Sequence, residues 1–146
     1  MPVRTLFILN PASRRGADRF GRLAAQLRSA LGDVEVVRTQ APLDAVRLAR
    51  EAARTGFERL IVGGGDGTLS EVATGVLEAG LGQAVEIGLV PLGSGCDFAR
   101  SVGVPAQTDR AIAQLSEGDS RLIDAGRITR FEAGQAEQQS YFLNEA

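Results

Sequence analysis

The sequence predicts an α/β domain in which a doubly wound, mostly parallel sheet carries helices on both faces. Apolar stretches of strand length alternate along the chain with amphipathic segments of helix length, an order typical of such sheets. Two glycine-rich segments directly follow predicted strands, as ligand-binding loops do in folds of this class. The chain has 146 residues, 44% of them hydrophobic, which suits one domain with a substantial core.

The first elements are a strand, a loop, a helix and a second strand. Val3–Leu9 ends in the apolar run Leu6–Leu9 and reads as a buried strand, and the Pro and Gly in Asn10–Gly16 predict a loop. From about Ala17 to Gly32, apolar residues recur at helical spacing on one face. Val34–Thr39 is rich in β-branched residues and predicts the second strand.

The middle of the chain repeats this order. Pro42 suits the first turn of a helix that ends at Gly56 and has Leu43 on its buried face. Leu60–Val62 predicts a short buried strand that runs into the first glycine-rich segment. The helical spacing of apolar residues over Leu69–Leu77 predicts a helix, and Val85–Val90 predicts the next strand.

The last third has weaker signals. Asp97–Val102 predicts one or two helical turns, and a further helix follows from Thr108. Arg121–Ile128 and Tyr141–Leu143 predict two strands, and the polar segment Phe131–Gln139 between them predicts a hairpin loop. The whole chain, residues 1–146, therefore reads as one domain.

The composition excludes several kinds of catalysis. The chain has no His and no Lys, and all 16 of its basic residues are Arg. Without these side chains it has no Ser-His-Asp or Cys-His pair, no P-loop lysine and no Schiff base. Carboxylates, hydroxyls, Arg and main-chain amides remain, a set that suits magnesium and phosphate. The net charge of −2 argues against a nucleic-acid partner.

A reducing cytoplasm is the expected compartment. The single cysteine, Cys96, cannot form an intrachain disulfide, and the first residues do not resemble a signal peptide. No apolar run is long enough to span a membrane. Any contact with the inner membrane face is therefore expected to be peripheral.

The segment Gly63–Thr68 predicts an anion-binding loop. Consecutive glycines allow main-chain amides to approach an anion, and the next helix would point its positive end at it. Asp66 in such a loop suggests a magnesium ion between protein and phosphate, and Glu71 could face a metal or a ribose. A plain turn in which Asp66 bonds its own backbone is the alternative. The segment lacks the third glycine of a dinucleotide fingerprint and the lysine of a P-loop.

Two further loops carry similar chemistry. Gly93–Asp97 offers small residues, the Ser94 hydroxyl and an acid, and we expect Cys96 there to be a small buried residue. Asp97 either caps a turn or joins Asp66 near magnesium. Asn10 and the amides of residues 12–14 would hold a nucleotide, although an Asn-Pro turn is equally common.

Three motifs together resemble the catalytic-domain signature of the diacylglycerol kinase family, which includes sphingosine kinases, ceramide kinases and bacterial lipid kinases. They are Asn10–Ser13, Gly64–Glu71 and Pro91–Arg100, and their order and spacing match along essentially the whole chain. The Gly-Gly-Asp-Gly core alone is less specific, because NAD kinases and 6-phosphofructokinases also have it.

The resemblance implies a fold like the N-terminal domain of NAD kinases and diacylglycerol kinases. It also implies that the chain binds ATP and Mg²⁺. The residues expected to bind ATP are Asn10, Pro11, Ala12, Ser13, Arg14, Thr39, Gly64, Gly65, Asp66, Gly67, Thr68, Glu71, Gly93 and Ser94. The residues expected in an acidic network around the metal are Asp66, Asp97 and Asp124. Two positions depart from the family pattern. This chain has Ser94 where most relatives have Thr, and Cys96 where most have Asn.

The activity implied by the resemblance is transfer of the γ-phosphate of ATP to a lipid hydroxyl, such as that of diacylglycerol. The resemblance also implies a protein of two domains and roughly twice this length. We therefore expect residues 140–146 to begin a second domain that this chain lacks. That domain would carry the general base and most of the lipid site, so no residue here is assigned as catalytic.

Two other functions remain open at this point. An NAD kinase-like enzyme would fit the Gly-Gly-Asp-Gly-Thr loop and Asn144-Glu145, but fits the Asn10 and Cys96 segments less well. A module that binds nucleotide without turnover would fit a chain without the second domain. An exposed edge at residues 141–146 would also allow a homodimer.

Overall fold

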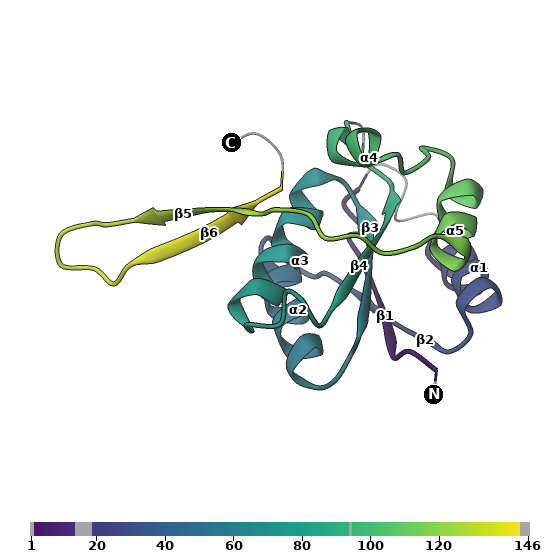
Figure 1. The fold of residues 1–146 in the computed structure, drawn as a ribbon, viewed down its shortest axis with the longest axis horizontal. Helices are drawn as coiled ribbons and strands as arrows, with labels where there is room; N and C mark the ends of the chain where they lie inside the picture. Colours follow the sequence, from purple (N-terminus) through teal and green to yellow (C-terminus); the bar gives the residue numbers. More distant parts are fainter. Residues whose placement is uncertain (1, 14–18, 94, 144–146) are drawn as a thin grey trace.

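A computed structural model describes residues 2–13, 19–93 and 95–143 of the chain. Strands and helices alternate through most of it (Figure 1). In order they are β1 (Thr5–Leu9), α1 (Phe20–Leu31), β2 (Val34–Arg38), α2 (Asp44–Arg54), β3 (Arg59–Gly64), α3 (Asp66–Glu78), β4 (Glu86–Pro91), α4 (Asp97–Val102), α5 (Thr108–Glu117), β5 (Gly126–Arg130) and β6 (Gln138–Phe142).

The predicted fold class is confirmed. Strands β1 to β4 form one parallel sheet in the order β2-β1-β3-β4. Helices α2 and α3 cover one face, and α1 and α5 cover the other (Figure 1). Two cores result because alternate residues of a strand point to opposite faces: Leu6 and Ile8 pack with α2 and α3, whereas Phe7 and Leu9 pack with α1.

The register of the sheet brings the carboxyl ends of its strands together. Leu9 lies opposite Arg38 on one side and Gly63 on the other. The ladder continues beyond the strands, because the Thr39 N–H donates to the Leu9 carbonyl and the Leu92 N–H donates to the Gly64 carbonyl, each at 2.9 Å. The segments that follow β1, β2, β3 and β4 therefore begin at one edge of the sheet, as the sequence predicts.

Helices α2 and α3 pack very closely. The buried face of α2 consists of alanines, and α3 places Gly75 against it. A Cβ built on Gly75 would lie 2.3 Å from the Val46 carbonyl oxygen and 2.9 Å from the Ala49 Cβ. Small residues on both helices thus set the distance between them.

The predicted start of α2 is wrong by about two residues. The helix begins at Asp44, and Leu43 precedes it with a left-handed φ of 66°. The Leu43 side chain is 67% exposed and does not lie on the buried face. The reason is that the main chain turns at residues 41–43, so Leu43 lies outside the helical periodicity.

The predicted strand at Arg121–Ile128 is also only partly present. Residues 121–125 form no strand, and Leu122 is 84% exposed. Apolar β-branched sequence favours a strand only where a partner and a buried face exist, and this segment has no ladder partner in the described sheet. The hairpin prediction is confirmed: β5 and β6 pair antiparallel and project away from the domain (Figure 1).

Among the described residues, no helix is long and apolar enough to cross a bilayer.

Candidate functional site

Asn10 joins the ends of three elements at the carboxyl edge of the sheet. Its side-chain oxygen accepts hydrogen bonds from the Ala12 N–H at 2.9 Å and from the Thr39 hydroxyl at 3.4 Å. Its side-chain N–H donates to the Thr68 hydroxyl oxygen at 3.0 Å. Thr39 and Thr68 are buried. Asn10 therefore makes the local turn and also ties the loop after β1 to β2 and to α3.

The first glycine-rich segment forms a tight junction between strand and helix. Gly63 and Gly64 are the last residues of β3, Gly65 is the N-cap of α3, and Asp66 is its first residue. Asp66 is thus at a helix start and not in the middle of a loop. A Cβ on Gly64 would lie 2.8 Å from the Thr68 hydroxyl oxygen, so glycine permits this close return of the chain.

The start of α3 is favourable for an anion. The first hydrogen bond of the helix runs from the Leu69 N–H to the Gly65 carbonyl at 3.1 Å. The N–H groups of the preceding first-turn residues have no partner within the helix. They lie at the positive end of the helix dipole, which attracts phosphate.

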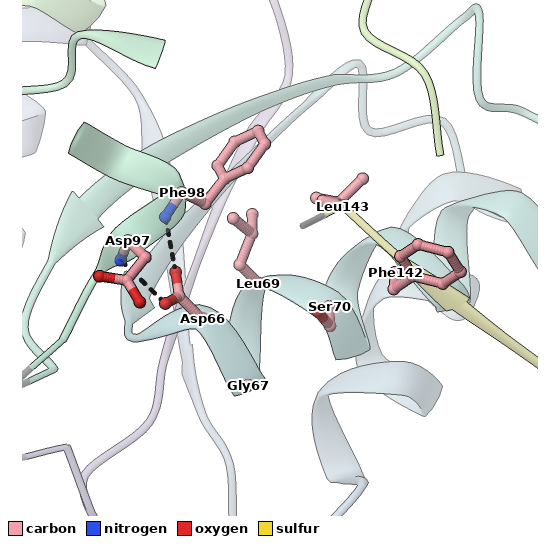
Figure 2. Close-up of a pocket in the computed structure, with 8 residues that line it drawn as sticks. All are labelled: Asp66, Gly67, Leu69, Ser70, Asp97, Phe98, Phe142 and Leu143. Carbon is pink, nitrogen blue, oxygen red and sulfur yellow. Dashed lines mark hydrogen bonds between the residues drawn. The ribbon is translucent and has the colours of Figure 1, made fainter. Parts of the chain in front are cut away.

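The second glycine-rich segment packs directly on this junction. A Cβ on Gly93 would lie 2.8 Å from the Gly65 Cα, so the two main chains are nearly in contact. The Asp66 carboxylate accepts hydrogen bonds from the Asp97 N–H at 2.9 Å and from the Phe98 N–H at 3.2 Å (Figure 2). Cys96 is buried, as predicted for a small packed residue.

These segments enclose a groove of about 450 Å³, within the size range of small-molecule sites. The residues around it come from the loop after β1, the start of α3 and the loop after β4. They belong to Asn10, Ala12, Ser13, Gly65, Gly67, Thr68, Glu71 and Gly93. The structure therefore gathers most of the predicted ATP-binding residues around one groove.

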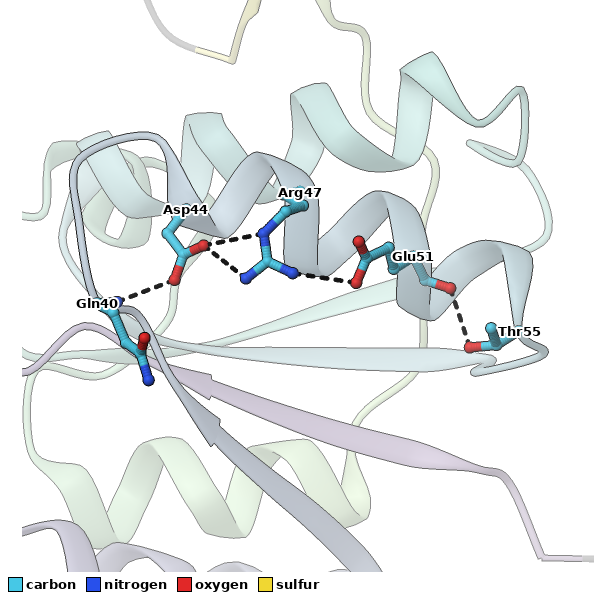
Figure 3. Close-up of polar contacts among 5 residues, drawn as sticks. All are labelled: Gln40, Asp44, Arg47, Glu51 and Thr55. Atoms are coloured by element: carbon cyan, nitrogen blue, oxygen red, sulfur yellow. Dashed lines mark hydrogen bonds and ion pairs between the residues drawn. The ribbon is translucent and has the colours of Figure 1, made fainter.

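Two carboxylates fix the turn beside this groove. The Leu43 N–H donates to a Glu71 carboxylate oxygen at 3.3 Å. The Asp44 carboxylate accepts from the Gln40 N–H at 2.9 Å and from the Arg47 guanidinium at 2.7 Å (Figure 3). These two interactions lower the pKa of Asp44 below its usual value. No sequence motif indicated this role for Asp44.

A second pocket, of about 330 Å³, is shown in Figure 2. Gly67 lines both cavities. The second pocket has both polar and apolar walls, and Asp66 and Asp97 lie at one end of it. Its apolar members are Leu69, Phe98, Phe142 and Leu143. The sequence did not predict this pocket: two of its three parts belong to the quoted motifs, but no pattern indicated that Phe142 and Leu143 would pack beside them.

The predicted acidic network is not assembled. The Asp97 carboxylate is exposed and pairs with Arg100, and Asp124 is an exposed residue of the irregular segment before β5. In the described ranges, no group of three or more Asp, Glu, His or Cys side chains is placed to hold a metal ion. Both oxygens of Asp66 already accept main-chain hydrogen bonds. In this structure the three carboxylates do not form one cluster, and their assignment to magnesium stays a prediction.

The remaining predicted residues have varied positions. Gly64 lies behind the groove, where an added Cβ would be 3.3 Å from the Ser13 hydroxyl oxygen. Pro11 follows Asn10 in the same turn. Arg14 and Ser94, together with Asn144 and Glu145, lie outside the described residues.

Comparison with known proteins matches a part of the chain that includes all residues around the groove. The family model described as the diacylglycerol kinase catalytic domain matches residues 4–128. "Probable lipid kinase YegS" of Salmonella heidelberg (strain SL476) is 44% identical over 85 residues, which are 58% of this chain and 28% of that protein. The corresponding protein of Salmonella arizonae is 42% identical over 85 residues.

Solved structures show the same likeness. A diacylglycerol kinase structure from Bacillus anthracis str. Sterne has a TM-score of 0.74 and 28% sequence identity. The match covers 85% of this chain and 43% of that one. The chain thus spans less than half the length of these lipid kinase relatives and of this diacylglycerol kinase structure. From the family match over most of its length, we conclude that the chain belongs to the diacylglycerol kinase catalytic domain family.

Proposed function

We propose that the groove binds MgATP and that the chain is the nucleotide-binding domain of a lipid kinase. The observation that supports this most is the Asn10 network, which brings the loop after β1 to the amide-rich start of α3. Main-chain amides from residues 65–68 would contact the phosphates, Glu71 lines the same groove, and Thr39 would act through its hydrogen bond with Asn10. Magnesium would enter with ATP, held mainly by phosphate and water oxygens.

The adjoining pocket is the proposed place of the lipid hydroxyl. Its apolar side chains suit a lipid chain, and Gly67, which lines both cavities, would stand between the two ligands. Binding of both would place the γ-phosphate of ATP near an alcohol such as that of diacylglycerol. The family match and the lipid kinase relatives support this choice of acceptor.

Catalysis in this scheme is mostly positioning. Phosphoryl transfer has little covalent chemistry for the protein to perform, and amides that neutralise phosphate charge provide much of the effect. Asp66 is poorly placed to act as a general base, because both of its oxygens accept main-chain N–H groups. We therefore propose that the group that deprotonates the lipid hydroxyl belongs to a second domain, which residues 140–146 would begin.

The NAD kinase-like alternative has no specific observation in its favour. The Gly-Gly-Asp-Gly segment that suggested it is common to both families. A module that binds ATP without turnover differs from the proposal in activity and not in binding, so the groove itself would be the same. Assays of phosphate transfer to diacylglycerol and to NAD with the full-length protein would separate the three.

Calorimetric titration with MgATP tests the groove. We expect saturable binding by the chain and weaker binding by Thr68→Val, because the substitution removes the acceptor of the Asn10 side-chain N–H. The loss of one such bond predicts a fall in affinity of about 2-fold to 10-fold. Thr74→Val is the matched control on the same helix, since among the described residues the Thr74 hydroxyl donates to the Ser70 carbonyl and not to Asn10. A folded chain that does not bind MgATP would refute the proposal.

Titration with a short-chain diacylglycerol tests the pocket. The methyl resonances of Leu69 and Leu143 should shift as the lipid is added, since both side chains line the pocket. Shifts confined to other leucines would place the lipid elsewhere.

A further inference from the structure

Asp66 connects the two glycine-rich segments through the main chain of α4. Its carboxylate accepts the N–H of Asp97 at 2.9 Å with one oxygen and the N–H of Phe98 at 3.2 Å with the other (Figure 2). These are the first two residues of α4. N–H groups at a helix start have no partner within the helix, so a carboxylate from α3 caps α4 across the fold.

The two glycine-rich segments also contact each other at Gly93. Gly65 and Gly93 approach so nearly that a Cβ on Gly93 would be 2.8 Å from the Gly65 Cα. The Cys96 thiol lies 3.3 Å from the Gly93 carbonyl oxygen, and Cys96 has a left-handed φ of 49°. We call this set, namely Gly65, Asp66, Gly93, Cys96 and the first two residues of α4, the loop clasp.

The side chains around Asp66 favour a structural partner over a metal. The carboxylate of Asp97 is exposed and pairs with Arg100. Among the described residues, Asp66 belongs to no group of three or more Asp, Glu, His or Cys side chains that could hold a metal ion. Hydrogen bonds to an ionised carboxylate are about twice as strong as neutral ones, and Asp66 makes two.

We propose that Asp66 is a positioning residue, which fixes Gly93 beside the start of α3 and so sets the shape of the groove. Without its carboxylate, α4 loses its cap and the loop that leads into it loses a fixed end. Gly93 lines the groove opposite the start of α3. The distance between Gly93 and Gly65 would then no longer be fixed, and neither would the width of the groove. The part that concerns ATP rests on the proposed function, whereas the clasp itself exists without any ligand.

Amide hydrogen exchange tests the clasp alone. In the chain with EDTA and no nucleotide, Asp66→Ala should speed exchange at the Asp97 and Phe98 amides by about 10-fold or more. Asp66→Asn keeps one acceptor oxygen and should have a smaller effect. Asp109→Asn, which alters an exposed acid at the start of α5, is the control. Unchanged exchange at both amides in a folded Asp66 variant would overturn the proposal.

Nucleotide binding then separates positioning from metal ligation. If Asp66 acts through α4, Asp66→Ala weakens binding of MgATP and of ATP in EDTA by similar factors, and Asp66→Asn restores part of both. If it holds the metal, only MgATP binding falls, and the proposal is wrong. Should the unaltered chain bind neither form, the proposed function fails, and the exchange experiment still decides whether the clasp exists.

Discussion

Replacing Gly75 with alanine tests the close packing of α2 on α3. The new Cβ would lie 2.3 Å from the Val46 carbonyl oxygen and 2.9 Å from both the Ala49 Cβ and the Arg50 main-chain nitrogen. Two of these three atoms belong to the main chain, so the helices must separate. Overpacking of this kind costs about 1–3 kcal/mol, and we expect the upper end because no flexible side chain can yield.

Alanine also favours the helix, by about 1 kcal/mol over glycine. The net destabilisation by Gly75→Ala should therefore be about 2 kcal/mol. Gly67→Ala is the matched control on the same helix, because a Cβ there meets no atom within 4 Å. It should leave stability unchanged or raise it by up to about 1 kcal/mol.

Urea denaturation of the two glycine variants and the unaltered chain measures both effects. We expect Gly75→Ala to lower the free energy of unfolding and Gly67→Ala to leave it unchanged or raise it, although the substitution is the same. A Gly75→Ala chain as stable as Gly67→Ala would refute it.

Three other changes follow from the same contacts. Leu43→Gly should raise the free energy of unfolding by up to about 1–2 kcal/mol, because Leu43 has a left-handed φ and a mostly exposed side chain; a loss of stability in urea denaturation would contradict this. Asp44→Asn should destabilise the chain at pH 7, because the ionised Asp44 carboxylate stabilises the fold and its folded-state pKa is below the unfolded value of 3.8. This stabilisation is lost as the pH falls below 3.8 and through the folded-state pKa, so the difference between the two chains should shrink there. Midpoints of urea denaturation for both chains between pH 7 and pH 2.5 check this, and a gap that does not narrow would count against it. Arg100→Ala removes an exposed ion pair with Asp97 and should change stability by less than about 1 kcal/mol; thermal unfolding with a larger shift would show that the pair is part of the clasp.

Most of the fold was predictable because its signals are local. The apolar run Leu6–Leu9 in β1 has both faces buried, and the helical spacing in α1 places Leu23, Ala24 and Leu27 in the core. Apolar periodicity also predicted α3 and β4. It could not predict the segment before β5, because Leu122 and Ile123 resemble a strand in sequence but have no partner in space.

The site was predictable only in part. The positions of Asn10, Thr39 and Gly65 follow from the rule that parallel strands end at one edge. The partners of Asp66 do not, because a bond between its carboxylate and the main chain of α4 depends on how two loops cross. Asp124 was assigned from resemblance, and it lies outside any metal-binding group of described residues.

The most direct test of the groove is to map MgATP onto the chain by amide chemical shifts. The groove predicts saturable shifts at Gly65 and Gly67, at the start of α3, and at Gly93, in the loop after β4. Gly134, in the projecting hairpin, should not move. Saturable shifts at Gly65 and Gly67 together with Gly93 would support a single nucleotide site at the edge of the sheet. Saturation with shifts elsewhere, or a folded chain with no shifts at all, would contradict it.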